Sequence, residues 1–128
     1  MPGGTETILV VEDTEPVRQA ARAALRRLGY EVLTAGGGQE ALALLERHAG
    51  QVHLLLTDVR MPGMSGPEVA QRIRGARPGV RVLYMTGYGG DALAGLPVDP
   101  RDIVEKPFTL EGLGRRVREA LGPPLSRA

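Results

Sequence analysis

Several residue types are absent from this 128-residue chain or scarce in it, and each absence excludes a class of function. There is no cysteine, which excludes disulfides, thiol catalysis and cysteine-ligated metal sites and fits a reducing cytoplasm. No apolar run approaches the ~20 residues of a membrane span, and the N-terminus does not have the form of a signal peptide. The sequence therefore predicts a cytoplasmic protein with no membrane partner.

Lysine is the scarcest charged residue, because Lys106 is the one lysine among 16 Lys+Arg residues. The arginines are scattered and the net charge is +1, whereas binding to a nucleic-acid backbone needs a clustered basic face. We therefore expect no nucleic-acid partner for this domain. The single lysine in an arginine-rich chain indicates a position where an ammonium serves better than a guanidinium.

The composition, with 42% hydrophobic and 24% charged residues, is that of one globular domain. Five short apolar runs alternate with segments of helical period. The runs occupy residues 7–13, 30–35, 52–58, 80–86 and 102–106. Strict β–α alternation predicts an α/β fold, in which a doubly wound five-stranded parallel sheet carries helices on both faces. The domain is expected over residues 7–121, with a disordered tail at 1–6 and a C-terminal tail at 122–128.

The helical segments carry their own start and stop signals. Apolar residues of the first helix recur at one face, which predicts that this face is buried: Val17, Ala20, Ala21, Ala24, Leu25 and Leu28. Ser65 marks the start of the third helix, and Thr109 is the expected cap of the last one. Residues 88–100 are rich in glycine and proline, so we expect only a turn or two of helix there, followed by loop.

Polar side chains stand at the carboxyl ends of four predicted strands. Glu12 and Asp13 end the first, Asp58 the third, Thr86 the fourth and Lys106 the fifth. These ends share one edge of a parallel sheet, so three carboxylates, a hydroxyl and an ammonium should converge there. Neighbouring carboxylates repel each other by ~1 kcal/mol per pair in water and by more when buried. A hard divalent cation offsets this repulsion, and an all-oxygen site suits Mg²⁺; the ammonium can offset part of it too.

The ammonium of Lys106 suits this place better than a guanidinium would. A compact charge on a flexible stem can hold a carboxylate and then move to an incoming phosphoryl oxygen, whereas the wide planar fork of arginine would not fit the same cavity. Pro107 restricts Lys106 to extended backbone, and a cis bond before the proline would fix the direction of its side chain.

With these residues, the chain resembles the receiver domains of two-component response regulators, including the chemotaxis regulators. The stretches that carry the resemblance are "ILVVEDTEPVR", "LLLTDVRMPGMSG", "VLYMTGYG" and "VEKPF", in the family's order. The resemblance implies a flavodoxin-like three-layer sandwich with strand order 2-1-3-4-5. The segments "MTGYGGDAL" and "VEKPF", together with the last helix, are similar to those of receivers in hybrid histidine kinases.

The resemblance also implies roles for the residues at the strand ends. Asp58 would accept a phosphoryl group from a phosphohistidine of a sensor histidine kinase or histidine phosphotransfer protein. Mg²⁺ would be held by Glu12, Asp13 and Asp58 with the backbone carbonyl of Arg60. Thr86 and Lys106 would each contact a phosphoryl oxygen, and residues 61–66 would shape the loop over the site. The reaction that the resemblance implies would be self-catalysed and depend on positioning and charge, and no external substrate would be turned over except small phosphodonors.

One departure concerns how the phosphorylated state is reported to other proteins. Many family members carry an aromatic three residues before the lysine, and this chain has Ile103 there. In those members the aromatic and the threonine move inward together on phosphorylation. Ile103 cannot play the part of the aromatic, and Tyr88 is a candidate for a related role.

Two other function classes fit less well. A phosphatase with an aspartyl-phosphate intermediate typically has a second Asp two residues after the first, where this chain has Arg60. An adaptor that had lost the chemistry would not need to retain the acids, Thr86 and Lys106.

The remaining polar features have ordinary structural interpretations. The glycines at 36–38 fit a plain turn, because no lysine follows them as it would in a phosphate-binding loop. His48 and His53 have no partners at metal-site spacing, and Tyr84 is expected in the core. Three arginines of the last helix are expected on a solvated face or in partner docking: Arg115, Arg116 and Arg118.

Overall fold

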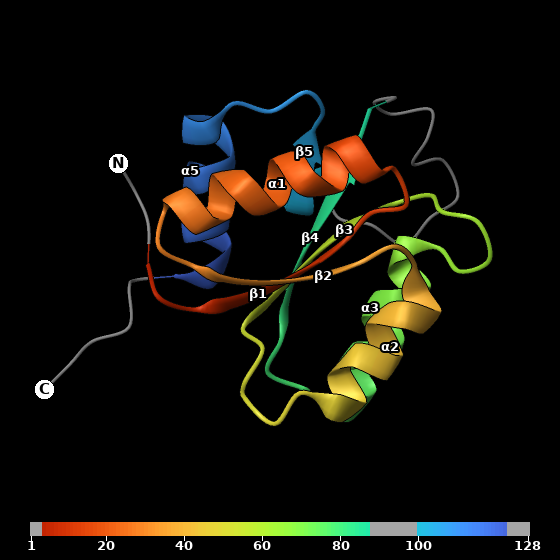
Figure 1. Ribbon diagram of the computed structural model, residues 1–128. Helices are drawn as coiled ribbons and strands as arrows, with labels where there is room; N and C mark the ends of the chain where they lie inside the picture. The colour runs from red at the N-terminus through yellow and green to blue at the C-terminus, as the bar shows by residue number, and fades with distance from the viewer. Residues whose placement is uncertain (1–3, 88–99, 123–128) are drawn as a thin grey trace, which may run out of the picture.

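The computed structural model describes residues 4–87 and 100–122, which form a five-stranded parallel sheet between two pairs of helices (Figure 1). The strands are β1 (Thr7–Val11), β2 (Glu31–Ala35), β3 (Leu54–Asp58), β4 (Arg81–Thr86) and β5 (Ile103–Glu105). The helices are α1 (Glu15–Arg27), α2 (Gly38–Arg47), α3 (Gly66–Ala76) and α5 (Leu110–Leu121), with a 3₁₀ turn at Pro100–Asp102. The strand order is β2-β1-β3-β4-β5, which confirms the predicted doubly wound fold.

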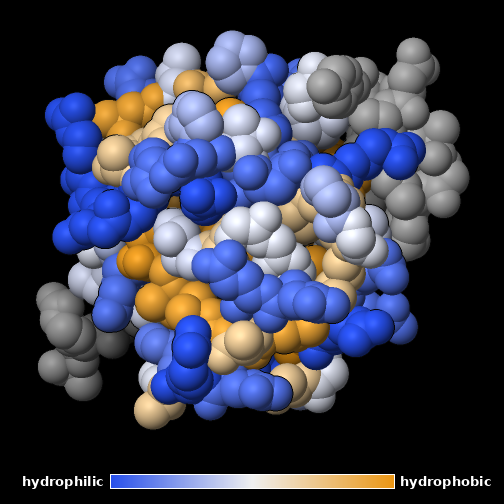
Figure 2. Space-filling view, turned by 45° about the vertical axis from the view of Figure 1, so that its right-hand side comes forward, coloured by the Kyte–Doolittle hydropathy of each residue, from blue (hydrophilic) through white to orange (hydrophobic). Residues whose placement is uncertain are grey.

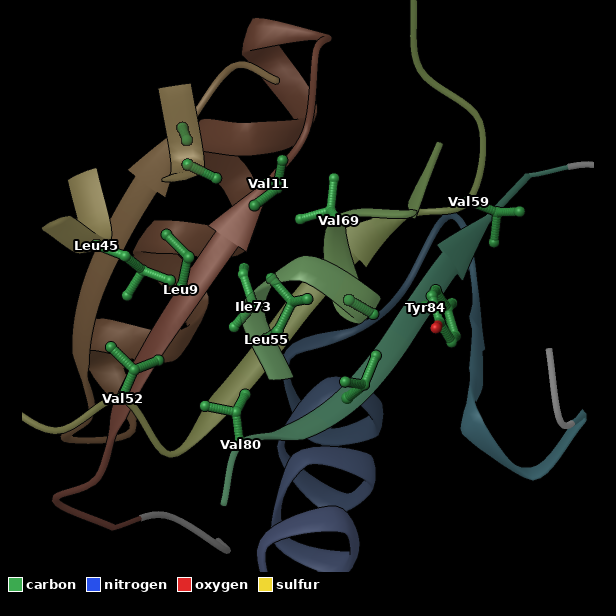
Figure 3. Packing of buried hydrophobic residues seen from close by; sticks show 14 of the residues in the cluster. Leu9, Val11, Leu45, Val52, Leu55, Val59, Val69, Ile73, Val80 and Tyr84 are labelled. Carbon is green, nitrogen blue, oxygen red and sulfur yellow. The ribbon is translucent and has the colours of Figure 1, made fainter. Parts of the chain in front are cut away.

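Each face of the sheet packs against one pair of helices. Side chains alternate along a strand, so Leu9 and Leu55 point to the face under α2 and α3, while Ile8 and Leu56 point to the face under α1 and α5. Figure 3 shows the first of these two clusters. The central strands are apolar on both faces because both are covered, as is usual for parallel sheets. Tyr84 lies in the first cluster, as predicted.

Helix ends follow the predicted signals with one exception. Ser65 accepts a hydrogen bond from the Glu68 amide and forms a capping box at the start of α3. Thr109 Oγ1 accepts one from the Gly112 amide at 2.9 Å, which caps α5. Thr14 precedes α1 as expected, but its side chain makes no capping hydrogen bond. The two caps fix where α3 and α5 begin relative to the strands before them.

The surface of α1 differs from the prediction at Ala20. Periodicity places this residue on the buried face, yet it is exposed, whereas Ala21 and Leu25 are fully buried. The side of α1 that carries Ala20 faces a groove bordered by Pro107 and Phe108 instead of the core. Apolar periodicity indicates which way a helix face points, but not how far its neighbours cover it.

The end of the sheet opposite the strands' carboxyl ends holds an ion pair that the sequence did not predict. Arg118 was expected on a solvated face, but its side chain is 13% exposed and pairs with Glu6 at 2.5 Å. Glu6 is buried, and the Gly4 amide donates to the Leu28 carbonyl, so residues 4–6 lie within the fold. The predicted boundary between a tail at 1–6 and the domain therefore differs from the structure.

His53, expected to be structural, accepts a hydrogen bond at Nδ1 from the Thr7 amide at 3.0 Å.

The predicted short helix in 88–100 and the candidate Tyr88 lie outside the described residues, except for the 3₁₀ turn that begins at residue 100. Within the described ranges, no helix is both long enough and apolar enough to cross a bilayer. Partly exposed apolar side chains remain on β2 and α2, such as Leu33 and Leu44. The face drawn in Figure 2 shows apolar surface between dispersed hydrophilic residues.

Candidate functional site

The candidate site lies at the carboxyl edge of the sheet, where the predicted residues come together. Glu12 and Asp13 follow directly after β1, Asp58 ends β3, and Thr86 ends β4. Lys106 follows β5, where its backbone amide donates to the Thr86 carbonyl at 2.8 Å and extends the pairing beyond the strand. The topology therefore places residues from distant parts of the chain at one sheet edge, as the strand alternation predicted.

Three carboxylates form the centre of the site. Glu12, Asp13 and Asp58 each offer an oxygen, and these atoms lie within 4.8 Å of one another. Glu12 is fully buried, Asp58 has a side chain that is 14% exposed, and Asp13 is exposed. Carboxylate oxygens are the ligands that hard divalent cations prefer. This cluster could hold a metal ion that approaches from solvent.

Lys106 lies between two of these carboxylates. Its Nζ donates to Glu12 Oε1 at 2.9 Å and to Asp58 Oδ2 at 3.3 Å. The peptide bond between Lys106 and Pro107 is cis, in agreement with the possibility raised from the sequence. The predicted contact with Asp58 is present, but the shorter contact is to Glu12.

The two carboxylates that share Lys106 have opposite pKa shifts. Burial raises the pKa of Asp58 to about 6, with a further contribution from the charge of Glu12, and Lys106 only partly counters this. Burial also acts to raise the pKa of Glu12, but hydrogen bonds from Lys106 and the Thr14 amide outweigh it and lower that pKa. Burial acts to lower the pKa of Lys106, but the two carboxylates raise it. The lysine therefore stays charged and Glu12 ionised, while Asp58 holds its proton more readily.

An open pocket of about 290 Å³ lies above the carboxylates. Its lining includes the predicted residues Asp58, Arg60, Thr86 and Lys106. Thr86 is 2% exposed, and Arg60 is exposed at the rim. The pocket thus presents the carboxylate of Asp58 beside an ammonium and a hydroxyl residue, with exposed Asp13 also in its lining, an arrangement that can accept an anionic group onto Asp58.

Gly66 supports the site, and from the sequence it was named only as the last residue of the 61–66 loop over the site. Its amide donates to the Val59 carbonyl at 2.8 Å, and a Cβ at this position would collide with the carbonyl oxygen of Asp58. Only glycine lets the start of α3 lie this close to the end of β3. The available signal was the glycine that closes the "MPGMSG" loop directly before the helical pattern.

An apolar groove of about 370 Å³ adjoins the pocket. Its walls are Val17 and Ala20 of α1 with Pro107 and Phe108 of the segment after β5. Lys106 lines both the groove and the pocket above Asp58. An apolar surface therefore lies directly beside the pocket that holds Asp58.

The comparisons with known proteins agree with this geometry. The family model of the response regulator receiver domain matches residues 8–118. The chain is 38% identical over 120 residues to the sensor kinase CckA of Brucella abortus (strain 2308), an alignment that covers 92% of this chain and 13% of that protein. It is 37% identical over 121 residues to the probable transcriptional regulatory protein TcrX of Mycobacterium tuberculosis (strain ATCC 25618 / H37Rv), with 93% and 51% covered.

Solved structures give the same result. The receiver domain from the hybrid histidine kinase CckA matches with a TM-score of 0.74 and 36% identity, covering 91% of this chain and 99% of that one. The chemotaxis protein CheY4 of Vibrio cholerae matches with a TM-score of 0.78 and 27% identity, covering 92% and 100%. The chain spans about half or less of the two curated relatives, but nearly all of these two solved chains.

Proposed function

The chain belongs to the response regulator receiver domain family of two-component systems, and we propose that Asp58 is its phosphoacceptor. A carboxylate oxygen of Asp58 attacks the phosphorus of a partner's phosphohistidine, the P–N bond breaks, and the imidazole leaves with a proton from solvent. The product is an aspartyl phosphate, whose formation changes the conformation of the domain. The observation that carries this proposal is the contact of Lys106 with Asp58 inside the carboxylate cluster.

The residues present fit Mg²⁺. Glu12, Asp13 and Asp58 supply carboxylate oxygens within 4.8 Å of one another, and Arg60, which lines the same pocket, would add its backbone carbonyl. All-oxygen donor sets with carboxylates suit this ion. When bound, Mg²⁺ would supply positive charge to the oxygens of the transferring phosphoryl group.

The protein side chains would hold the remaining oxygens of the phosphoryl group. The ammonium of Lys106, now bound to Asp58 Oδ2 at 3.3 Å, would move to one phosphoryl oxygen, and the hydroxyl of Thr86 would donate to another. These groups position charge and do not form covalent bonds, which is the usual division of work in phosphoryl transfer. On this proposal the domain turns over no external metabolite and uses small phosphodonors only to phosphorylate itself.

The partner on this proposal is a sensor histidine kinase or a histidine phosphotransfer protein, met in the cytoplasm. The apolar groove beside Lys106 would receive the partner's histidine-bearing surface, because it is continuous with the pocket over Asp58. The similarity to the CckA receiver supports a relay that includes a hybrid kinase.

The proposal is tested by incubating the protein with Mg²⁺ and acetyl phosphate and measuring its intact mass. The wild type should gain one phosphoryl group, and Asp58→Asn should gain none. A wild type that gains no mass, although folded and supplied with Mg²⁺, would contradict the proposal and favour an adaptor without the chemistry.

A further inference from the structure

The backbone carbonyl of Glu12 is held by a side chain from the first turns of α1. Arg18 Nη1 donates to this carbonyl oxygen at 2.9 Å, and the Arg18 side chain is 19% exposed. Strand β1 ends at Val11, so the carbonyl of Glu12 lies beyond the last residue of the strand. Glu12 is nevertheless fully buried. A buried carbonyl without a hydrogen-bond partner destabilises the folded protein. Arg18 therefore supplies a bond that the strand does not.

The other polar groups of Glu12 are each held by a different part of the chain. Its amide donates to the Ala35 carbonyl at the end of β2 at 3.1 Å. Its Oε2 accepts from the Thr14 amide at 3.0 Å, and its Oε1 accepts from Lys106 at 2.9 Å. With the bond from Arg18, all four polar atoms of Glu12 are paired, which fixes this residue in one orientation.

The bond from Arg18 bears on the next residue as well. The carbonyl of Glu12 and the amide of Asp13 belong to one planar peptide unit. Holding the carbonyl therefore sets the direction in which the chain enters Asp13, an exposed member of the carboxylate cluster.

Charge alone would not favour an arginine here. A guanidinium so close to the carboxylates repels a divalent cation, and the pairing of Arg18 with Glu15 at 3.9 Å offsets this little, since Glu15 is 73% exposed. The benefit of Arg18 must then come from its geometry. We propose that Arg18 is a positioning residue of the metal site, which acts through the Glu12–Asp13 peptide and touches neither the ion nor the phosphoryl group. This inference rests on the proposed function.

The sign of the effect on metal affinity separates position from charge. If Arg18 acted only through its charge, Arg18→Met would tighten Mg²⁺ binding. If it positions the Glu12–Asp13 peptide, Arg18→Met should weaken binding by about tenfold, the lower end of the effect seen for residues that orient metal ligands. Arg18→Lys keeps the charge and one donor but loses the fork, so it should weaken binding less than Arg18→Met.

The measurement is isothermal titration calorimetry with MgCl₂, with folding checked by circular dichroism. Arg22→Met is the matched control, because it removes the same charge one turn further along α1, at a residue for which the described parts of the chain give no hydrogen bond or ion pair. It should leave the affinity unchanged or slightly tightened. Phosphorylation by acetyl phosphate should need more Mg²⁺ in Arg18→Met but reach the wild-type rate at saturation.

The outcomes separate this inference from the proposed function. A wild type that binds no Mg²⁺ contradicts the proposed function itself. A wild type that binds Mg²⁺, with equal or tighter binding in Arg18→Met, overturns the role of Arg18. If Arg18→Met does not fold, Arg18→Ala takes its place, because it also removes both the charge and the donor, and equal or tighter Mg²⁺ binding would equally overturn the inference.

Discussion

Glu12 and Asp58 share the ammonium of Lys106 but differ in what else holds them. Glu12 has the shorter contact with Lys106 and a backbone amide on its other oxygen, whereas Asp58 has the longer contact and the charge of Glu12 beside it. Burial of a carboxylate is costly unless hydrogen bonds compensate for it. The residue that the proposed chemistry requires to react is thus the less stabilised of the two.

The raised pKa of Asp58 predicts a dependence of stability on pH. The folded protein, with its pKa at about 6 against an ordinary 3.8, binds more protons than the unfolded chain between these values. Stability should therefore fall as the pH rises from about 4 to above 6, and the contribution is fully unfavourable at pH 7. Asp58→Asn removes this contribution, so without metal it should exceed the wild type by about 1 to 3 kcal/mol at pH 7 and by much less at pH 4. Urea unfolding of both proteins at several pH values checks this, and a pH-independent difference would contradict it.

Lys106→Arg tests whether the size of the cation matters. The lysine Nζ fits between Glu12 and Asp58, with donor distances of 2.9 and 3.3 Å, and the broader guanidinium fork has to displace one of them. The variant should fold and bind Mg²⁺, but its phosphorylation by acetyl phosphate should be slower by about tenfold or more, as followed by intact mass. Lys106→Met serves as the comparison without charge. An arginine variant as fast as the wild type would refute the argument from size.

At the scale of elements, the site depends on how closely α3 approaches β3. The loop that joins them ends at Ser65, and a Cβ on Gly66, the first residue of α3, would meet the Asp58 carbonyl oxygen. The same helix carries Gly75, where a Cβ would meet no atom within 4 Å. Two glycines of one helix therefore have opposite requirements.

Gly66→Ala should displace α3 from the end of β3, because the added Cβ meets rigid backbone at the Asp58 carbonyl. We expect a loss of about 2 kcal/mol or more in the free energy of unfolding, with weaker Mg²⁺ binding. Gly75→Ala is the matched control and should be neutral or stabilising by up to about 1 kcal/mol, since alanine favours the helix. Equal effects in the two variants, measured by urea unfolding, would argue against the close approach.

A second link between elements joins the start of β1 to α5. Arg118 makes two bonds to Glu6, Nη2 to Oε2 at 2.5 Å and Nη1 to Oε1 at 3.2 Å, and Nη1 also reaches Tyr30. The hydrogen bond from Arg118 lowers the pKa of Glu6. The pair therefore contributes stability above the ordinary pKa of 4.5, and this contribution is lost as the pH falls through the lowered value.

Glu6→Gln should destabilise the protein by roughly 2 kcal/mol at pH 7, because it leaves the partly buried guanidinium without its counter-charge. The matched control is Glu119→Gln on α5, the helix that carries Arg118. Glu119 pairs with Arg116 at 3.5 Å, and the Glu119 side chain is 62% exposed. That change should alter stability by less than about 0.5 kcal/mol. The difference between wild type and Glu6→Gln should vanish in acid; if it persisted there, the ion pair would not be its source.

At the scale of the whole molecule, the fold follows from local patterns that the sequence displays openly. Alternating strands and helices dictate a parallel sheet, and its carboxyl edge then gathers Glu12, Asp13, Asp58, Thr86 and Lys106. What could not be predicted depends on distant neighbours. Arg118 finds Glu6 from 112 residues away, and Ala20 is exposed because the adjoining segment leaves a groove. Arginines on a helix surface look alike in sequence, so Arg18 could not be told from Arg22.

The groove beside the site predicts that phosphotransfer from a protein partner and phosphorylation by a small phosphodonor respond differently to a substitution in the groove. Ala20→Asp places a charge in the apolar groove, so phosphotransfer from a phosphorylated histidine kinase domain should slow by about tenfold, equivalent to about 1.4 kcal/mol. Phosphorylation by acetyl phosphate should not change. Ala23→Asp adds the same charge to an exposed position of α1 outside the groove and should leave both rates unaltered. Equal slowing by both variants would show a general charge effect.

The use of lysine at one position only also gives the protein a built-in chemical reporter. A reagent that acylates primary amines has a single side chain to modify, and that side chain is the ammonium between Glu12 and Asp58. Only the deprotonated amine reacts, and both carboxylates raise the pKa of Lys106. Its acylation rate, read from one peptide by mass spectrometry, should therefore report how strongly the neighbouring anions hold the ammonium.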